Sequence, residues 1–445
     1  MRSDDASFDV VIVGAGFSGT MAAAQLVKRG LSVVVVEGGA RAGQGIAYST
    51  DDAVHLLNVP AAKMTAWPEQ PDDFVEAGHE AGSFAPRREF GAYLRAILDQ
   101  AAADGVRLIE ANAISAVRND GWRVTLDSGQ GITARALVLA QGNQPPEPMR
   151  AGEGIDPQLF VNNPWGSAAR DAIGRVVAEG EKCGSRDVMI LGTGLTMVDM
   201  VLSLDAAGYG GRIVALSRRG QIPRAHAAHD AAPVALDAVP QGNVLALWRW
   251  LRVRSAAVGW RGAVDALRPH AQQLWRGFDA VEQGRFLRHA RPYWDVHRHR
   301  IAPQVAERLR AMIAEARLEV VAGRLSGVRE EHGALVVNYA RRGAPTTGHL
   351  REQEGRFEVL FNCTGPLGTM GRTRDRVLRQ MIDDRLVAVD RLGIGLAVDP
   401  DSRAGARVWA LGPLTKGAFW EIVAVPDIRG QVARVADDIV KELKP

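Results

Sequence analysis

The stretch Asp9-Val-Val-Ile-Val-Gly-Ala-Gly-Phe-Ser-Gly19 decides the fold of this chain. The apolar residues before its first glycine predict a buried parallel strand, and the residues after Gly19 predict a helix up to Arg29. Gly14 permits the tight turn between them, Gly16 lets the backbone approach a pyrophosphate, and Gly19 lets the helix pack on the strand. This spacing is typical of a dinucleotide-binding turn.

A second apolar run, Val33-Val-Val-Val-Glu37, ends in a carboxylate 18 residues after Gly19. A carboxylate at this position can accept hydrogen bonds from both ribose hydroxyls of a dinucleotide. The free N–H groups and positive end of the preceding helix suit the phosphates. The order strand, turn, helix, strand, Glu37 therefore predicts a dinucleotide site, and the alternative is a glycine-rich turn in an α/β fold without a ligand.

The same pattern returns at Asp187-Val-Met-Ile-Leu-Gly-Thr-Gly-Leu-Thr-Met-Val-Asp199. Gly192 and Gly194 keep the phosphate turn, whereas Met197 occupies the third glycine position. We expect this departure to loosen the packing of helix on strand and to leave the turn intact.

The strand after the second turn ends in Ser217-Arg-Arg-Gly220 and carries no acidic residue at its tip. Arg218 and Arg219 stand where the 2′-phosphate of NADP would lie. They favour NADP and disfavour NAD, so the second site is predicted to take NADPH.

Each glycine turn leads, through short strands, to another apolar strand that ends in glycine, at Gly142 and Gly365. The second copy is 45 residues longer than the first (173 against 128 residues from turn to closing glycine), and the excess falls in a helical, Trp- and Arg-rich stretch at about 221–316. The duplication predicts an α/β fold with two Rossmann-like domains, the NADPH domain being inserted into a discontinuous FAD domain. The expected bounds are 1–160 and 366–445 for the FAD domain and 161–365 for the NADPH domain.

Composition excludes several classes of protein. The 445 residues are 47% hydrophobic and 24% charged, and the net charge of +3 includes no solid basic run, so no nucleic-acid partner is expected. With neither an apolar signal region nor an apolar run of about 18 residues, we expect a cytoplasmic protein without a membrane span. Cys183 and Cys363 are 180 residues apart and form no C-x-x-C, which argues against a redox dithiol within one chain. Whether the chain forms a homo-oligomer is left open.

Three further stretches narrow the interpretation. They are Gly45-Ile-Ala-Tyr-Ser-Thr50 with His55-Leu-Leu-Asn-Val-Pro-Ala61, then Phe286-Leu-Arg-His-Ala-Arg-Pro-Tyr-Trp-Asp-Val-His-Arg-His-Arg300, and Gly412-Pro-Leu-Thr-Lys-Gly-Ala-Phe-Trp-Glu-Ile-Val-Ala-Val-Pro-Asp-Ile-Arg429. Together with the two glycine turns, they resemble the FAD/NAD(P)-binding flavoprotein family that contains the L-aspartate N-monooxygenases. The resemblance covers nearly the whole chain and implies FAD and NADPH as cofactors.

The resemblance and the two motifs also assign cofactor contacts. The expected FAD residues are Gly14, Gly16, Phe17, Ser18, Gly19, Glu37, Arg41, Asn58, Val59, Gly142, Gly412 and Asp427. The expected NADPH residues are Gly192, Thr193, Gly194, Thr196, Arg218, Arg219 and Gly365. The helix opened by Asp427 is expected to point its positive end at the flavin. The usual Gly-Asp of the closing FAD motif, which contacts the ribityl chain, is replaced here by Gly412-Pro413.

The segment from Phe286 to Arg300 holds the densest cationic cluster in the chain. Its Arg291, His297 and Arg298 are the candidate substrate contacts, as a clamp for an anionic group. The alternatives are contacts with the NADPH phosphates and structural ion pairs that join the inserted helices to both domains. No metal site is expected, because the H-x-H pair has no third ligand nearby.

These features favour an FAD- and NADPH-dependent monooxygenase. By resemblance, NADPH reduces the flavin, reduced flavin and O2 give a C4a-hydroperoxide, and its distal oxygen passes to the amine of a small, acidic amino acid. The alternatives are an NADPH-dependent flavin reductase without oxygenation and a nucleotide-binding protein without turnover. No catalytic residue is assigned, since the flavin carries the chemistry.

Overall fold

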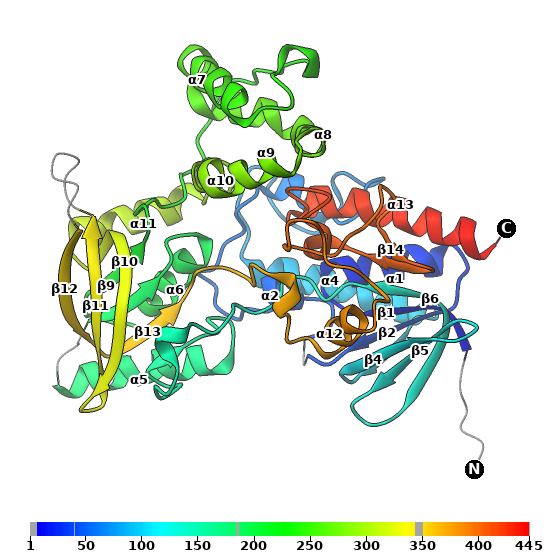
Figure 1. Ribbon diagram of the computed structural model, residues 1–445, viewed down its shortest axis with the longest axis horizontal. Coiled ribbons are helices and arrows are strands. Elements are labelled where there is room, and N and C mark those ends of the chain that lie inside the picture. The colour runs from blue at the N-terminus through cyan, green and yellow to red at the C-terminus, as the bar shows by residue number, and fades with distance from the viewer. Residues whose placement is uncertain (1–6, 40, 184–186, 343–349, 445) are drawn as a thin grey trace.

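The computed structural model describes residues 7–39, 41–183, 187–342 and 350–444 of the chain. It contains two sheets at opposite ends of the molecule, with a group of helices above the junction between them (Figure 1). The predicted fold class, α/β with two Rossmann-like units of which the first is discontinuous, is confirmed.

The first sheet takes strands from both ends of the chain, in the order β14-β15-β6-β1-β2-β3, with β5 paired to β6 and β4 to β5. Its strands are β1 (Ser7–Val13), β2 (Val33–Glu37), β3 (Arg107–Glu110), β4 (Ala113–Arg118), β5 (Trp122–Leu126), β6 (Gly131–Leu139), β14 (Arg403–Gly405) and β15 (Val408–Ala410). One face packs against α1 (Phe17–Lys28), α4 (Arg87–Ala103) and α13 (Val425–Leu443), and the other against β4, β5 and α12 (Arg376–Asp383). The buried valines of β1 and β2 point alternately to the two faces of the sheet, so they contribute to the hydrophobic core on each face.

The second sheet has the order β12-β11-β10-β9-β8-β13-β7. Its strands are β7 (Phe160–Val161), β8 (Val188–Leu191), β9 (Ile213–Ser217), β10 (Leu318–Glu331), β11 (Ala334–Arg342), β12 (Leu350–Phe357) and β13 (Val359–Asn362). Helices α5 (Ser167–Cys183), α6 (Leu195–Ala206) and α11 (Pro303–Ala314) accompany it. The strands β7, β8, β9 and β13 and the first part of β10 pair in parallel, as expected for a nucleotide-binding sheet.

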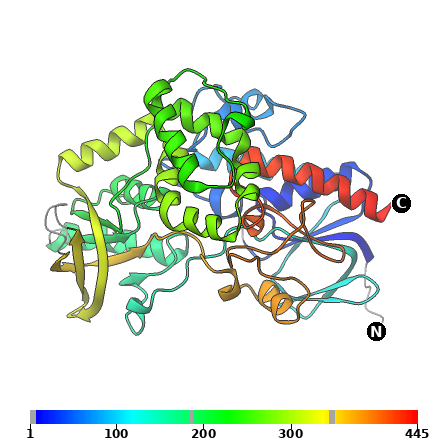
Figure 2. The same ribbon diagram turned by 45° about the horizontal axis from the view of Figure 1, so that its top comes forward.

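The inserted helices follow β9 and come forward over the junction of the two sheets in Figure 2. They are α7 (Val244–Leu267), α8 (Ala271–Gly277), α9 (Ala280–Arg285), a π-helical turn (Phe286–Ala290) and α10 (Arg291–Arg298). Gly259, with φ of 76° and ψ of 149°, interrupts α7. The shorter elements of the chain are α2 (Gly45–Tyr48), α3 (Asp73–Glu76) and the 3-10 turns Ala61–Lys63, Arg150–Gly152, Leu236–Ala238, Arg268–His270, Met370–Arg372 and Gly412–Thr415.

Most element boundaries agree with the expectations from sequence, and three differ. The first helix begins at Phe17 instead of after Gly19, because its first turn already forms on the glycine-rich loop. The expected strands Ile132–Arg135 and Ala136 onward are one continuous β6. The helical stretch expected at about 221–316 is broken between Phe286 and Arg298 into a π-helical turn and α10.

Candidate functional site

The first glycine turn has the backbone geometry that a dinucleotide requires. Gly14 has φ of 101°, and a methyl group there would lie 2.6 Å from the carbonyl oxygen of Ala140. A methyl group on Gly19 would lie 1.8 Å from the carbonyl oxygen of Gly14, so helix and strand meet only through glycine. Helix α1 then starts from Gly16 without a side-chain cap, which leaves its first N–H groups available to phosphate oxygens.

The carboxylate of Glu37 lies beside this turn, as predicted. Its two oxygens accept hydrogen bonds from the backbone N–H groups of Ala15 (2.7 Å) and Gly39 (2.8 Å). The acid is thus oriented at the end of β2, where a ribose would lie. Arg41 points toward Asp51, with Nη1 2.8 Å from Oδ1, and this ion pair is exposed.

The closing segment of the chain completes the first site. Gly412 has φ of 61°, and a methyl group there would lie 2.7 Å from the Oγ of Ser18 in the first turn of α1. Its N–H donates to Oε1 of Gln431 in α13 at 2.8 Å. Gly142, with φ of 66°, follows β6 in the same sheet. These contacts bring residues from the two ends of the chain to one cradle, and the donors and close approaches present fit the phosphate and ribityl parts of FAD.

A cavity of about 620 Å³, here called the inner cavity, lies where the two sheets and the inserted helices meet. Its wall on the side of the first sheet includes the predicted contacts Asn58 and Val59 and the residues Val423 to Val425. These last residues open α13, whose cap residue Ala424 makes no side-chain hydrogen bond, so the positive helix end faces the cavity. The predicted helix at Asp427 is confirmed in position, but the Asp427 side chain itself lines a different cavity.

His226 forms part of the opposite wall and was missed by the sequence reasoning. Its Nε2 lies 3.0 Å from the carbonyl oxygen of Asn58, and its ring centre is 5.0 Å from that of Phe84. Burial lowers the pKa of His226 to about 4, so the ring is neutral near pH 7. Because the carbonyl of Asn58 only accepts, the Nε2 atom carries the proton and Nδ1 does not.

The three candidate substrate residues do not come together, which corrects the expectation of one clamp. Arg298 lines the inner cavity, but Arg291 and His297 do not, because α10 places Arg291 on its exposed face and the ring of His297 against Trp260 of α7 (ring centres 4.9 Å apart). Arg291 is half exposed and pairs with Asp295 in the next turn (3.1 Å). His297 contacts the carbonyl oxygen of Tyr293 through Nδ1 (2.7 Å).

Arg298 is held by a buried carboxylate. Its Nε lies 2.7 Å from Oε2 of Glu421, and Trp294 donates its Nε1–H to Oε1 of the same acid at 2.6 Å. Burial acts to raise the pKa of Glu421, but Arg298 and His299 outweigh it and hold that pKa below its usual value. The Arg298–Glu421 pair is therefore ionised, and its charges largely cancel next to the inner cavity.

The second glycine turn repeats the geometry of the first. Gly192 has φ of 101°, and a methyl group there would lie 2.2 Å from the carbonyl oxygen of Cys363. Gly194 caps α6, whose first residue Leu195 lines the inner cavity. The donors and glycines of this turn fit a second dinucleotide whose far end reaches that cavity.

The remaining predicted NADPH contacts surround this turn. The Oγ1 of Thr193 lies 2.9 Å from the Oγ of Ser217, which ties the turn to the end of β9. Arg218 is exposed, and the Arg219 guanidinium lies 5.5 Å above the ring of Tyr293. Thr196 faces another cavity at the border of the two sheets, and Gly365, with φ of 102°, follows β13.

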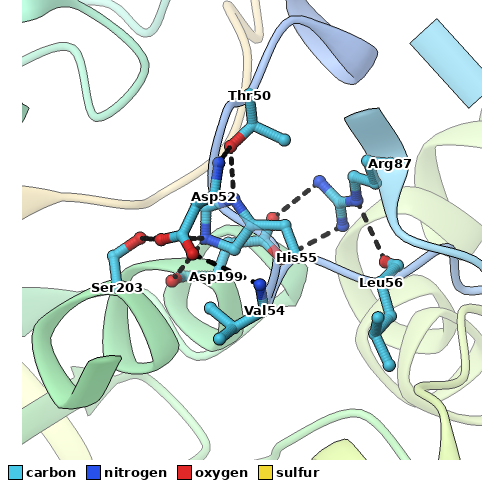
Figure 3. A network of polar contacts seen from close by, with 8 residues as sticks. All are labelled: Thr50, Asp52, Val54, His55, Leu56, Arg87, Asp199 and Ser203. Carbon is cyan, nitrogen blue, oxygen red and sulfur yellow. Dashed lines mark hydrogen bonds and ion pairs between the residues drawn. The ribbon is translucent and has the colours of Figure 1, made fainter. Parts of the chain in front are cut away.

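A buried polar network crosses the border between the two sheets (Figure 3). Arg87, at the start of α4, donates from Nη1 and Nη2 to the two oxygens of Asp199 in α6 (2.8 and 3.1 Å) and from Nε to the carbonyl oxygen of Leu56 (3.1 Å). His55 contacts Ser203 of α6 through Nε2 at 2.9 Å. The side chains of Arg87 and Asp199 are only 13% and 7% exposed, so a charged bidentate pair fixes α6 against the first sheet.

Within the part of the chain that the structure describes, no helix is long and apolar enough to cross a membrane. No group of three or more His, Cys, Asp or Glu side chains among these residues is placed to hold a metal ion. Cys363 is buried, and burial raises the pKa of its thiol. The side chain of Cys183 is not among those that the structure describes.

Comparison with known protein families identifies the first unit. Residues 11–144 match the family described as FAD-NAD(P)-binding. The N-terminal unit is an FAD/NAD(P)-binding domain. The match covers the turn at Gly14, the carboxylate of Glu37 and the strand before Gly142, the same features that form the first cradle. No curated protein sequence matches the chain.

Solved structures are similar to the chain over nearly its whole length. The ornithine N-hydroxylase of Kutzneria sp. 744, in complex with reduced FAD, NADP+ and L-ornithine, has a TM-score of 0.66 at 15% identity, covering 98% of this chain and 100% of its own. The L-lysine 6-monooxygenase of Pseudomonas syringae has a TM-score of 0.65 at 16% identity over the same shares. The bacillithiol disulfide reductase of Staphylococcus aureus has a TM-score of 0.58 at 12% identity, and the match covers 98% of this chain and 99% of the reductase. These similarities establish the fold, that of flavoproteins with two dinucleotide-binding domains.

Proposed function

We propose that the protein is an FAD- and NADPH-dependent monooxygenase that N-hydroxylates a small, acidic amino acid or a related amine. The observation that carries the proposal is the inner cavity, which is bordered by the start of α13 from the first domain and by the start of α6, directly after the second glycine turn, from the second. Its 620 Å³ give room for a flavin ring, a nicotinamide end and a small substrate to meet. Structural similarity to ornithine and lysine hydroxylases supports the reaction class.

The residues of the chain supply binding, orientation and exclusion of water. Gly14, Gly16 and Gly412 give the close backbone approach that FAD phosphates need, and Glu37 is placed for the adenosine ribose. The uncapped start of α13 presents a positive helix end to the flavin ring. These residues would hold FAD, which would supply acceptance of hydride from NADPH and reactivity toward O2.

The domain arrangement that we propose follows the two sheets. Residues 1–160 and 366–445 would hold FAD, and residues 161–365 would hold NADPH, with Thr193, Gly194 and Thr196 at its pyrophosphate and Arg218 and Arg219 at its 2′-phosphate. The exposed position of Arg218 leaves its charge available for a ligand.

A flavin reductase without oxygenation is the second candidate, and similarity to the bacillithiol disulfide reductase favours it. A dithiol mechanism of disulfide reduction is disfavoured, because the sequence has two cysteines and no C-x-x-C, and Cys363 is buried with a raised pKa.

The deciding experiment reduces the FAD-loaded protein with NADPH in the absence of oxygen and then admits oxygen with and without an amine. A monooxygenase gives a hydroxylated amine in proportion to NADPH consumed. Rapid NADPH oxidation that yields only hydrogen peroxide with every amine offered would support the reductase. A flavin that NADPH does not reduce would leave a binding protein without turnover.

A further inference from the structure

A second cavity, here called the outer cavity, adjoins the inner one. It measures about 560 Å³ and lies between the inserted helices and α13. Lys63 and Arg268 line both cavities, so the two spaces meet at these side chains. The outer cavity therefore borders the place where flavin and nicotinamide are expected to meet.

The outer cavity is strongly cationic. Five of its lining side chains carry positive charge, whereas Asp427 is its single acidic residue. The cationic residues are Lys63, Arg268, Arg276, Arg429 and Arg434. They come from the Ala61–Lys63 turn, the inserted helices and α13, three segments far apart in the sequence, so the folded structure gathers them. A cavity with this charge attracts anions and raises their local concentration.

Arg268 stands apart from its neighbours because its charge is poorly compensated. Its nearest carboxylate oxygen, Oδ2 of Asp427, is 3.9 Å away, and within the described residues its guanidinium makes no hydrogen bond. By contrast, Arg298 and Arg300 in the same region each lie 2.7 Å from a carboxylate oxygen. Burial, and then the nearby Arg298, lower the pKa of Arg268 below its usual value.

Two further charged groups, Asp427 and Arg429, line the outer cavity near Arg268. The Oδ2 atom of Asp427 is buried without a hydrogen bond in the described structure. Arg429 uses Nη1 on the carbonyl oxygen of Thr65 (2.9 Å). Among the described residues, Arg298 and Arg300 each have a carboxylate oxygen at 2.7 Å, whereas that of Arg268 is 3.9 Å away, so Arg268 keeps more of its charge for a ligand.

We propose that the outer cavity binds the anionic group, a carboxylate or a phosphate, of the amine that the inner cavity oxidises, with Arg268 as the main contact and Lys63, Arg429 and Arg434 in support. The proposal rests on the proposed function for the identity of the reaction, but it assigns the anion to residues that the sequence reasoning did not consider. The amine end would pass Arg268 and reach the flavin, while the anionic end stays between α8 and α13.

Binding of malonate tests the site without turnover. The protein is loaded with FAD and saturated with NADP+, so that the phosphate sites of both dinucleotides are filled, and malonate is titrated by calorimetry at constant ionic strength. Malonamide, its neutral analogue, is the ligand control. We expect malonate to bind and malonamide not to bind. Arg268→Gln should raise the dissociation constant of malonate by roughly 10- to 100-fold, because one charge-assisted contact is lost.

Two further variants make the result decisive. Arg434→Gln changes an exposed residue that lines only the outer cavity, and it should weaken malonate by a few-fold while folding normally. Arg252→Gln, an exposed arginine of α7 outside both cavities, should leave the affinity unchanged. Equal effects of Arg252→Gln and Arg268→Gln, or no malonate binding to the unaltered protein, would overturn the proposal. Loss of oxygenation with malonate binding intact would instead refute the proposed function.

Discussion

The ion pair between Arg87 and Asp199 gives the most demanding prediction, because it tests how the two domains are held together. Arg87→Met keeps the length of the side chain and removes its charge, so Asp199, 7% exposed, loses both hydrogen bonds to its carboxylate. An unpaired buried carboxylate costs about 3–5 kcal/mol. Asp199→Asn removes the opposite charge and should cost a similar amount for the same reason.

The double variant should be less destabilised than the sum of the two single variants, by roughly 2–3 kcal/mol, because neither charge then remains unpaired. Urea unfolding of the FAD-loaded protein measures these differences. The matched control is Arg95→Met, which breaks an exposed pair with Asp99 (45% and 56% exposed) on the same helix and should cost at most about 0.5 kcal/mol.

The same variants should slow the transfer of hydride. Helix α6 begins at the second glycine turn and carries Asp199, so loss of the pair frees the NADPH turn to move relative to the inner cavity (Figure 3). A displacement of about 1 Å can cost on the order of 100-fold in rate. We expect anaerobic flavin reduction at saturating NADPH to slow by roughly 10- to 100-fold, with the FAD spectrum unchanged. The reasoning would be refuted if the destabilisation of the double variant equalled the sum of the two single variants. It would also be refuted if flavin reduction by NADPH were as fast in Arg87→Met, Asp199→Asn and the double variant as in the unaltered protein.

Three other predictions concern single parts of the site. Replacing Arg218 and Arg219 by alanine should raise the KM for NADPH by roughly 10- to 100-fold and leave NADH nearly unchanged; a parallel rise for both nucleotides would count against their role. Gly412→Ala, whose methyl group would meet Ser18 at 2.7 Å, should leave the purified protein without FAD, as absorbance shows directly. Because burial lowers the pKa of His226 from 6.5 to about 4, the unfolded chain binds the proton more readily below pH 6.5, so stability should fall as the pH falls from 6.5 toward 4. His226→Gln should remove this part of the pH dependence, and a melting temperature with an unaltered pH profile would contradict it.

Local sequence patterns predicted those parts of the site whose geometry is itself local. The turns at Gly14 and Gly192 could be found because their positive φ angles and close approaches admit only glycine. The helix that begins at Val425 and ends at Leu443 follows from its apolar spacing and from Pro426 in its first turn.

The interdomain contacts could not be predicted in the same way. Arg87 and Asp199 are 112 residues apart, and neither position carries a local signal of its partner. His226 lies in a segment without regular structure, and only the fold places it against Asn58.

The positions of Arg291 and His297 outside the inner cavity have a related cause. Trp294 and Arg298 are one helical turn apart on α10, and both reach Glu421. Spacing does not tell which face of a helix looks at the rest of the protein, however. Charge density alone does not distinguish a ligand site from ion pairs on an exposed helix face, such as that of Arg291 with Asp295.

The contact of Gly412 with Ser18 has a consequence for the synthesis of the protein. The flavin cradle joins α1 to a segment almost 400 residues later, and Gln431 of the last helix holds that segment in place. Synthesis must therefore pass Gln431 before the cradle can form, whereas the strands of the second sheet, from β7 to β13, are complete by Asn362. FAD capture is then a late step of maturation, and by binding only the finished fold it draws the N-terminal domain toward its native state. Cells short of flavin would accumulate chains with a formed second domain and an open first one.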